Sequence, residues 1–473
     1  MSTKLRESVS WEKAMIAFLF LLGITLRLRQ YLTGRSLWAD EAMLALNIVN
    51  RSIGGLFKPL DYDQGAPIGF LLVEKMFNLL FGRNEYALRL FPLLTGILSI
   101  WLFYLLSKRI TKGAGLITAL ALFVLNPRLI YYSSEAKQYM VDVAVCLALL
   151  LLASPLFENK SQKKDFVRLA AAGFLALWFS HPSVFVLAGI GLTLVIMYLK
   201  RRDTTHLGYV IGMGILWMIT VGVLYLLVLN ELQQNAYMQE YWQGAFFPFP
   251  PWSDPGWFDR SLTENIGVQF GIPYGVDLVF GFMLAGWIVL WQTRRTYALA
   301  FGLTLFLTLA ASAVRLYPVF ERMILFLIPI GLILIGKTVE ALDRKLQSLR
   351  WAGKLITLAI AGFMIYGPLI TSISNFIEPK YFEHIHPAMQ FLDDTWKDGD
   401  IVFVTHGAVP AFEYYAPAYG LTGIPYLSSQ RQDYQQPERI LKQLDSLLGR
   451  RRAWILMSHV YEKGDFNERG FIL

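Results

Sequence analysis

Charged residues are scarce in this chain, because Asp, Glu, Lys and Arg make up only 16% of its 473 residues. A soluble protein carries about 25% charged residues. Cysteine is almost absent, and the single Cys146 excludes a disulfide within one chain. Hydrophobic residues, by contrast, reach 55%. This composition excludes an ordinary soluble enzyme and predicts long segments in contact with lipid.

Two common signatures of function are also missing. The glycine-rich stretch at 113–121 lacks the lysine of a phosphate-binding loop. No histidines show the spacing of a zinc site, and His384 and His386 are expected on a solvated connection. The net charge of +8 comes from short basic clusters between apolar runs, which is the pattern of membrane topology and not of nucleic-acid binding.

About eleven apolar runs are long enough to cross a bilayer. The first has no small-residue cleavage site and is interpreted as a retained signal anchor. Two of the runs are separated only by His181 and Pro182, so they are expected to form a tight hairpin or a re-entrant pair. The sequence therefore predicts an α-helical polytopic membrane protein with runs near residues 12–30, 88–106, 114–131, 139–157, 166–180, 183–199, 207–229, 274–291, 297–314, 323–340 and 353–373.

Basic residues gather in alternate loops between these runs. If the spans alternate, all of these loops lie on the same side as the N-terminus, and the positive-inside rule makes that side cytoplasmic. The loops contain Lys108, Arg109, Lys112, Lys160, Lys163, Lys164, Lys200, Arg201, Arg202, Arg294, Arg295, Arg344, Lys345 and Arg350, and the N-terminus adds Lys4, Arg6 and Lys13.

Three longer segments are then predicted on the extracytoplasmic side. The first is a loop at 31–86, in which 66–81 is interpreted as a helix in the membrane interface. The second is a loop at 230–273, whose FFPFPPW stretch is expected to form an ordered lid or an interfacial anchor. The third is 374–473, where two strand-then-turn patterns predict a small α/β domain that follows a transmembrane domain at 1–373.

Acidic residues at the outer boundary indicate function, because polar groups are costly there. Asp40 and Glu41 follow the first span in SLWADEAMLAL. Such a pair can provide a general base and an orienting or metal-binding partner. The same two residues could instead begin a helix, and both interpretations can hold together.

Cations form an outer basic zone. Lys137, in YYSSEAKQYMVD, could pair with Glu135 or Asp142, or present its charge to a lipid phosphate. Arg315 and Arg322 suggest an anionic ligand held by guanidinium groups, with interfacial snorkelling as the alternative. The predicted phosphate-binding residues are Lys137, Tyr139, Arg315, Arg322, Tyr317, Arg35 and His181, the last of which could equally be a polar turn residue.

Four blocks of sequence together resemble the GT-C superfamily of membrane glycosyltransferases, which includes protein O-mannosyltransferases and lipid A aminoarabinose transferases. They are LWADEAMLAL, GAPIGFLLVEKMFNLLFGRNEYALRLFPLLTG, YYSSEAKQYMVDV and YPVFERMILFLIP, within residues 10–340. Many relatives have a His-Pro-Pro motif in the first loop, whereas residues 64–67 here read Gln-Gly-Ala-Pro. That difference leaves any acceptor specificity tied to the motif open.

The resemblance implies a bacterial inner-membrane enzyme that moves a sugar from a polyprenyl-phosphate donor to a hydroxyl of a lipid, glycan or protein acceptor. Asp40 matches the position of the general base and Glu41 completes the acidic pair, with a divalent metal possible between them. Lys137, Arg315 and Arg322 match basic positions near the lipid phosphate. Direct displacement at the anomeric carbon would invert its configuration, with the cations stabilising the departing phosphate.

Two other classes of protein are compatible with a polytopic chain. A lipid or solute transporter or flippase would favour polar residues at mid-membrane depth and a repeated half, and the sequence shows neither. An O-antigen-type ligase or polymerase uses similar lipid-linked donors but transfers a whole glycan from a pyrophosphate carrier. We therefore expect a glycosyltransferase that faces the outside, with membrane lipids and no nucleic acid as partners.

Overall fold

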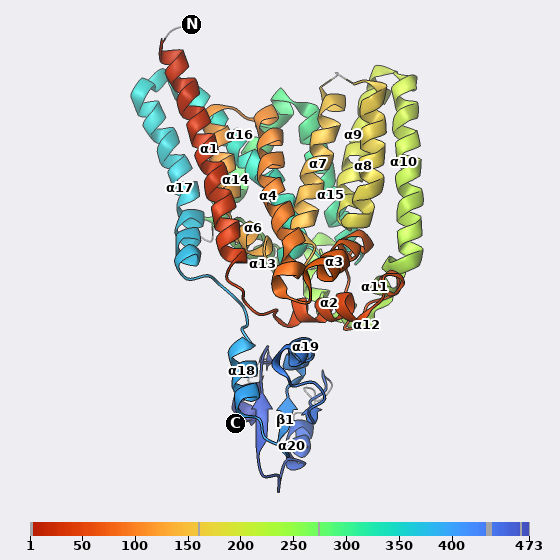
Figure 1. The fold of residues 1–473 in the computed structure, drawn as a ribbon. Coiled ribbons are helices and arrows are strands. Elements are labelled where there is room, and N and C mark those ends of the chain that lie inside the picture. The colour runs from red at the N-terminus through yellow and green to blue at the C-terminus, as the bar shows by residue number, and fades with distance from the viewer. Residues whose placement is uncertain (1–2, 159–160, 273–274, 432–437, 464–465, 473) are drawn as a thin grey trace.

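A computed structural model describes residues 3–158, 161–272, 275–431, 438–463 and 466–472. The apolar runs predicted from the sequence are helical, and the helices lie side by side in one bundle (Figure 1). The run at 114–131 is broken at Asn126 into two helices, and the run at 323–340 begins in a 3-10 segment. The helices are α1 (Thr3–Tyr31), α4 (Glu85–Ile110), α5 (Gly113–Leu125), α7 (Tyr139–Phe157), α8 (Lys163–Phe179), α9 (Ser183–Arg201), α10 (Thr204–Leu224), α14 (Val276–Thr293), α15 (Arg295–Ala313), α16 (Ile328–Leu346) and α17 (Arg350–Ile377).

Seven helical stretches of the described residues are long and apolar enough to cross a membrane. One of them, Glu321–Ile377, is 57 residues long and contains both α16 and α17. The short helices α5 and α8, with 13 and 17 residues, fall below the roughly 20 residues of a full span. Helix α5 is largely buried among its neighbours in the bundle.

The basic loops gather at one end of the bundle. There Glu158, at the end of α7, pairs with Arg109 at 3.8 Å and Arg294 at 3.4 Å, and accepts a hydrogen bond of 3.0 Å from Tyr297. Lys337 of α16 donates to the Ile110 carbonyl at 3.0 Å. These contacts join the ends of α4, α7, α15 and α16. The opposite end carries the first loop and the C-terminal region, and we call it the loop end (Figure 1).

At the loop end, α2 (Ala39–Asn50) and α3 (Ile68–Phe81) lie across the ends of the bundle helices (Figure 1). Helix α3 buries its first turn and exposes Met76, Leu79, Leu80 and Phe81. Its exposed side chains are apolar and its charged residues Glu74 and Lys75 are buried, and the interface position predicted for 66–81 stays a prediction. Beside these two helices lies the short α6 (Pro127–Tyr132), which precedes the turn that leads into α7.

The second loop folds into short helices at the same end, α11 (Asn230–Gln234), α12 (Ala236–Tyr241) and α13 (Pro255–Ser261). In its FFPFPPW stretch, Phe249 and Trp252 are strongly exposed. Of the two predictions for this stretch, outward-facing aromatic side chains favour an interfacial anchor.

The C-terminal region contains a three-stranded parallel sheet in the order β2-β1-β3. Strands β1 (Ile401–Val404) and β3 (Ala453–Leu456) are the two predicted from the sequence, and β2 is Tyr426–Ser428. Val402 lies opposite Tyr426 on one side and Trp454 on the other. The remaining elements are α18 (His386–Thr395), α19 (Val409–Tyr415), α20 (Glu438–Asp445), a hairpin of β4 (Glu462–Lys463) and β5 (Phe466–Asn467), and α21 (Glu468–Ile472).

One apolar cluster joins this region to the first loop. Leu37 and Ala42 of the first loop share it with Met389, Tyr414 and Tyr415 of the C-terminal region. Polar contacts add to it: His386 pairs with Glu85 at 2.8 Å. The prediction of a solvated connection at His384 and His386 is therefore wrong for His386, which is a contact residue between the two regions.

Candidate active site

The two acids Asp40 and Glu41 lie in the first turn of α2, as the helix-start interpretation expected. The helix begins where Trp38 has an extended backbone, and the Trp38 N–H donates to Glu41 at 3.4 Å. Carboxylates are stabilised there by the unpaired N–H groups of the helix end. Because the two residues are neighbours in a helix, their side chains point in different directions.

Glu41 points into the protein and is fully buried. Arg89 donates two hydrogen bonds to its oxygens, at 2.8 and 2.6 Å, and the Ala136 N–H donates another at 2.7 Å. Arg35 lies 3.5 Å away and also donates to the hydroxyl of Tyr131. Glu41, Arg89 and Arg35 thus form one buried ion-pair cluster, in which, within the described residues, Arg35 Nε alone is left without a hydrogen-bond partner. These contacts bind the Glu41 carboxylate within the protein, and the catalytic role of Glu41 and the phosphate-binding role of Arg35 stay predictions.

Asp40 points the other way, toward two cations from distant parts of the chain. Lys137 lies 3.0 Å from Oδ1, and Arg322, from the 3-10 helix η6 (Glu321–Leu327), lies 3.1 Å from Oδ2. Lys137 also donates to Gln64 at 2.5 Å. The Asp40 side chain keeps 19% of its surface exposed. The structure thus brings together three of the predicted site residues, and Lys137 pairs with Asp40 and not with Glu135 or Asp142.

Aromatic rings border this cluster. The Arg322 guanidinium lies 5.4 Å from the ring centre of Trp38 and 5.7 Å from that of Tyr139, which are cation–π distances. Trp38 directly precedes α2, and Tyr139 begins α7. The predicted residue Tyr139 therefore lies in the site, where it orients Arg322 and offers a flat apolar surface.

Polar atoms without hydrogen-bond partners concentrate here. Most buried polar groups in proteins are paired, so such a concentration marks a place where a ligand completes the bonding. Glu135, between α6 and α7, is fully buried and neither of its oxygens has a partner. Besides Asp40 Oδ2, which has only its ion pair with Arg322, the side-chain atoms here without a hydrogen-bond partner among the described residues are Trp38 Nε1, Glu135 Oε1 and Oε2, Gln138 Oε1 and Arg322 Nε.

Burial and neighbouring charges separate the pKa values of the two acids beside Lys137. Burial raises the pKa of Asp40, but the charges of Lys137 and Arg322 outweigh it and lower the pKa to about 2. Burial, with the nearby charge of Glu41, raises the pKa of Glu135 to about 7. At neutral pH Asp40 is therefore ionised and Glu135 is partly protonated. One can accept a proton or a cation, and the other can donate a hydrogen bond.

Three predicted residues lie away from the cluster. Arg315 is exposed, with a left-handed backbone (φ 59°), and its carbonyl accepts a bond from Gln239. The Tyr317 hydroxyl donates to the Met323 carbonyl at 2.7 Å, which fixes the segment before Arg322. His181 lies in the turn between α8 and α9 and, within the described residues, has no hydrogen bond to Asp40, Lys137 or Arg322. The geometry supports none of the three as a phosphate ligand.

A divalent metal between Asp40 and Glu41 does not fit these contacts. The Asp40 oxygens face two cationic side chains, and the Glu41 oxygens are taken by Arg89 and a backbone N–H. Among the described residues, no group of three His, Cys, Asp or Glu side chains converges on one point. Metal coordination by this pair would require both ion-pair clusters to break.

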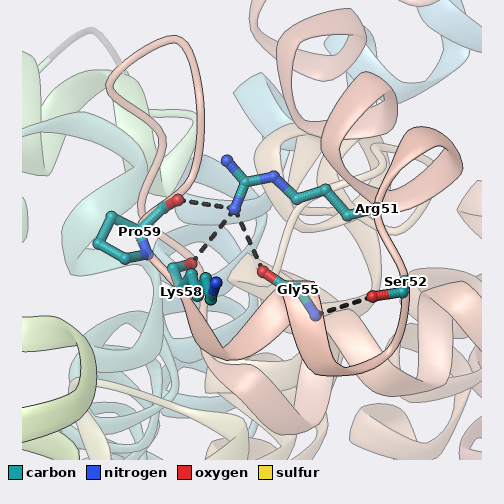
Figure 2. A pocket seen from close by; sticks show the side chains of 5 residues that line it. All are labelled: Arg51, Ser52, Gly55, Lys58 and Pro59. Atoms are coloured by element: carbon teal, nitrogen blue, oxygen red, sulfur yellow. Dashed lines mark hydrogen bonds between the residues drawn. The ribbon is translucent and has the colours of Figure 1, made fainter.

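A basic surface hollow in the first loop has the wrong chemistry for a ligand site. It is lined by Arg51, Ser52, Gly55, Lys58 and Pro59 (Figure 2). The Arg51 guanidinium donates to three backbone carbonyls, at 2.6 Å to Pro59, 3.2 Å to Gly55 and 3.4 Å to Lys58, and it pairs with Asp61 at 2.9 Å. Arg51 therefore holds this loop closed, and its charge is balanced within the loop by Asp61.

Sequence reasoning missed Gln64, Trp38 and Glu135 as site residues. Gln64 stands where the His-Pro-Pro motif of relatives was expected, and its amide oxygen binds Lys137. The sequence difference at residues 64–67 therefore includes a residue that contacts the Asp40 cluster. Glu135 lies two positions before Lys137 in the same block, but its burial without partners is visible only in the structure.

Comparison with known proteins places the fold. Residues 65–226 match the family model of dolichyl-phosphate-mannose-protein mannosyltransferases. ArnT from Cupriavidus metallidurans, in a structure bound to undecaprenyl phosphate, is 14% identical with a TM-score of 0.53, over 93% of this chain and 90% of ArnT. Its apo structure gives a TM-score of 0.51 over the same shares. This chain has the GT-C fold.

A second GT-C structure agrees. The Archaeoglobus fulgidus oligosaccharyltransferase, in complex with Zn and sulfate, is 13% identical with a TM-score of 0.53, over 87% of this chain and 62% of that one. A search of curated protein sequences finds no match. The fold implied by the four sequence blocks is therefore confirmed. The family match includes Glu135 and Lys137, whereas Asp40, Gln64 and Arg322 lie outside it.

Proposed function

We propose that this protein is a membrane glycosyltransferase that moves a sugar from a polyprenyl-phosphate donor to an acceptor hydroxyl at Asp40. The observation that carries the proposal is a carboxylate held between Lys137 at 3.0 Å and Arg322 at 3.1 Å, amid buried polar atoms without partners. The GT-C fold, the mannosyltransferase family match and the undecaprenyl phosphate bound to ArnT support the same class of donor.

The donor phosphate would take the place of Asp40 between the two cations. A phosphodiester offers Lys137 a compact negative charge and Arg322 a pair of oxygens for its planar fork. When both cations turn to the phosphate, they stop holding the pKa of Asp40 low. The Asp40 carboxylate is then a stronger base beside the bound sugar. Donor binding would thus prepare the base for the acceptor.

The transfer itself follows from these positions. Asp40 takes the proton of the acceptor hydroxyl, whose oxygen forms a bond to the anomeric carbon. The bond from that carbon to the phosphate oxygen breaks, and its electron pair stays on the phosphate. Lys137 and Arg322 stabilise the negative charge that develops there, and protonated Glu135 can donate a hydrogen bond to it. Attack opposite the departing phosphate inverts the anomeric configuration.

We place the loop end outside the cytoplasm, in a bacterial inner membrane. The support is the clustering of basic loops at the other end, which the positive-inside rule assigns to the cytoplasm. The donor lipid would then lie in the outer leaflet, and the acceptor, a lipid, glycan or protein, would approach from the side of the C-terminal region.

Donor turnover in proteoliposomes tests the function. Wild type, Asp40→Asn and the matched control Asp61→Asn would be incubated with a panel of radiolabelled polyprenyl-phosphate sugars and a bacterial membrane extract. We expect wild type and Asp61→Asn to release polyprenyl phosphate and Asp40→Asn not to. Equal release by all three would remove Asp40 as the base. No release from any donor, with movement of lipid or solute across the bilayer, would replace the enzyme by a transporter.

A further inference from the structure

Several side chains of the C-terminal region border the Asp40 site, among them Phe382, whose ring centre lies 5.5 Å from that of Trp38, and His459. The His459 imidazole centre lies 6.2 Å from the ring centre of Trp38. Trp38 is also the ring beside which the Arg322 guanidinium lies, at 5.4 Å, and Arg322 pairs with Asp40. The imidazole is therefore on the rim of the same site, on the side away from the helix bundle.

Glu383 fixes this imidazole and the start of α2 at once. Its carboxylate lies 2.5 Å from His459 Nδ1 and accepts hydrogen bonds from the Ser458 hydroxyl at 3.2 Å and the Ala39 N–H at 3.1 Å. Ala39 directly precedes Asp40. One carboxylate, in the segment between α17 and α18, thus sets the position of His459 relative to the catalytic turn.

The backbone at His459 is held in an unfavourable conformation. Its φ is 51°, in the left-handed region that costs energy for a side chain other than glycine. A Cβ placed on Gly407 would lie 2.6 Å from the His459 carbonyl oxygen, so the two backbones are in close contact. Strain of this kind persists where the surrounding contacts impose it, and it is frequent at functional positions.

The chemistry of the imidazole suits an exchangeable contact. A carboxylate on Nδ1 fixes the ring orientation and leaves Nε2 as the second polar atom, and 53% of the side chain is exposed. The hydrogen bond to Glu383 raises the pKa of His459. Burial opposes this shift, and the negative charges of Glu383, Asp40 and Glu468 add to it. Arg322, across the Trp38 ring, is the cation on this side. His459 can therefore donate as well as accept a hydrogen bond near neutral pH.

We propose that His459 is a residue of the acceptor subsite, which hydrogen-bonds the acceptor through Nε2 and holds its hydroxyl against Asp40. The proposal rests on the proposed glycosyl transfer. Lys137 and Arg322, which would bind the donor phosphate, come from the bundle, whereas His459 comes from the C-terminal region. The subsite would accept a hydroxyl-bearing molecule that enters between Trp38 and the C-terminal region.

A pair of histidine variants tests this assignment. Asn tolerates a left-handed backbone, so His459→Asn removes the imidazole with little strain. His386→Asn is the matched control, because His386 also joins the C-terminal region to a carboxylate of the bundle side, Glu85 at 2.8 Å, but shows no ring contact with Trp38 within the described residues. Three quantities would be measured: affinity for undecaprenyl phosphate, donor hydrolysis in water, and transfer to a titrated membrane extract.

We expect His459→Asn to lower transfer at limiting extract by about tenfold or more. Its affinity for undecaprenyl phosphate and its donor hydrolysis should stay within about twofold of wild type. Glu383→Gln, which loosens the same imidazole, should shift transfer in the same direction by less, and His386→Asn should leave all three quantities unchanged.

Any of three results would overturn the assignment. One is an equal loss of transfer, hydrolysis and phosphate affinity in His459→Asn, which would make the residue a folding contact. The other two are unchanged transfer in His459→Asn and the same loss of transfer in His386→Asn, because both deny His459 a special effect on transfer. Failure of the proposed function looks different: wild type itself would then consume no donor and bind no undecaprenyl phosphate.

Discussion

Asp40 and Glu41 are neighbours in one helical turn, yet they lie in opposite environments. Glu41 is fully buried, and its oxygens are bound by Arg89 and a backbone N–H with Arg35 beside them. Asp40 keeps 19% of its surface exposed and holds two cations among unpartnered polar atoms. A closed ion-pair cluster stabilises the fold, whereas an open one can exchange its carboxylate for a ligand. The same residue chemistry thus forms a closed cluster at one position and, as we propose, a functional one at the next.

The largest effect should come from the open cluster. Asp40→Asn removes the base without changing side-chain size, so we expect transfer to fall by about 10²- to 10⁴-fold, the usual contribution of a positioned base. The variant should still fold, so the thermal midpoint of the purified protein in detergent should match that of wild type. Full transfer activity in Asp40→Asn would show that Asp40 does not act as the base and so does not differ from Glu41 in function.

Glu41→Gln should show the reverse pattern. Removing one partner of a buried ion pair leaves the other charge uncompensated, which costs about 3–5 kcal/mol. We expect a large drop in the thermal midpoint and in the yield of folded protein. The turnover of the molecules that do fold, counted by active-site titration with labelled donor, should change little. A stable but inactive Glu41→Gln would instead place Glu41 in the reaction.

The two cations should contribute less than the base. Lys137→Met and Arg322→Gln each remove a charged hydrogen bond of about 1.5–3 kcal/mol, which corresponds to roughly 10- to 100-fold weaker binding of undecaprenyl phosphate. Arg315→Gln is the matched control, because Arg315 is exposed and lies outside the cluster. If Arg315→Gln weakened binding as much as Arg322→Gln, both arginines would have to bind the phosphate, as the sequence alone suggested.

The smallest effect should be a pH dependence of docking. Because contact with Glu383 raises the pKa of His459 above its ordinary 6.5, the contact stabilises the folded protein fully below that value. This stabilisation is lost as the pH rises through the folded-state pKa. The thermal midpoint should therefore fall slightly between neutral and alkaline pH in wild type, and the fall should be reduced in Glu383→Gln. An identical pH dependence in both proteins would contradict the contact.

The sequence predicted the helices well because apolarity is a local property of the chain. It also identified Asp40, Lys137 and Arg322 as candidates, since charged residues are conspicuous near a membrane boundary. The sequence could not show that Lys137 and Arg322 both contact Asp40. Lys137 is 97 residues from Asp40, and Arg322 lies much later in the chain, in η6. No spacing rule connects such positions.

The sequence also did not show which way each side chain points from its helix. Asp40 and Glu41 share one helical turn but face opposite environments, and Arg315 lies in the turn after α15, outside the η6 helix that carries Arg322. Those directions depend on how α2 and η6 dock, and docking is set by tertiary packing. The contact of His386 with Glu85 was missed for the same reason, because it joins segments 301 residues apart.

Affinity for undecaprenyl phosphate in wild type, Asp40→Asn and Glu41→Gln tests most directly whether Asp40 occupies the place of the donor phosphate. If it does, Asp40→Asn frees Lys137 and Arg322 and removes a repelling charge. Binding should then tighten by about tenfold, or 1.4 kcal/mol, even though transfer is lost. Glu41→Gln, measured per folded molecule, should leave the affinity unchanged. Equal or weaker binding by Asp40→Asn would contradict the account, because the carboxylate would not compete with phosphate for the two cations.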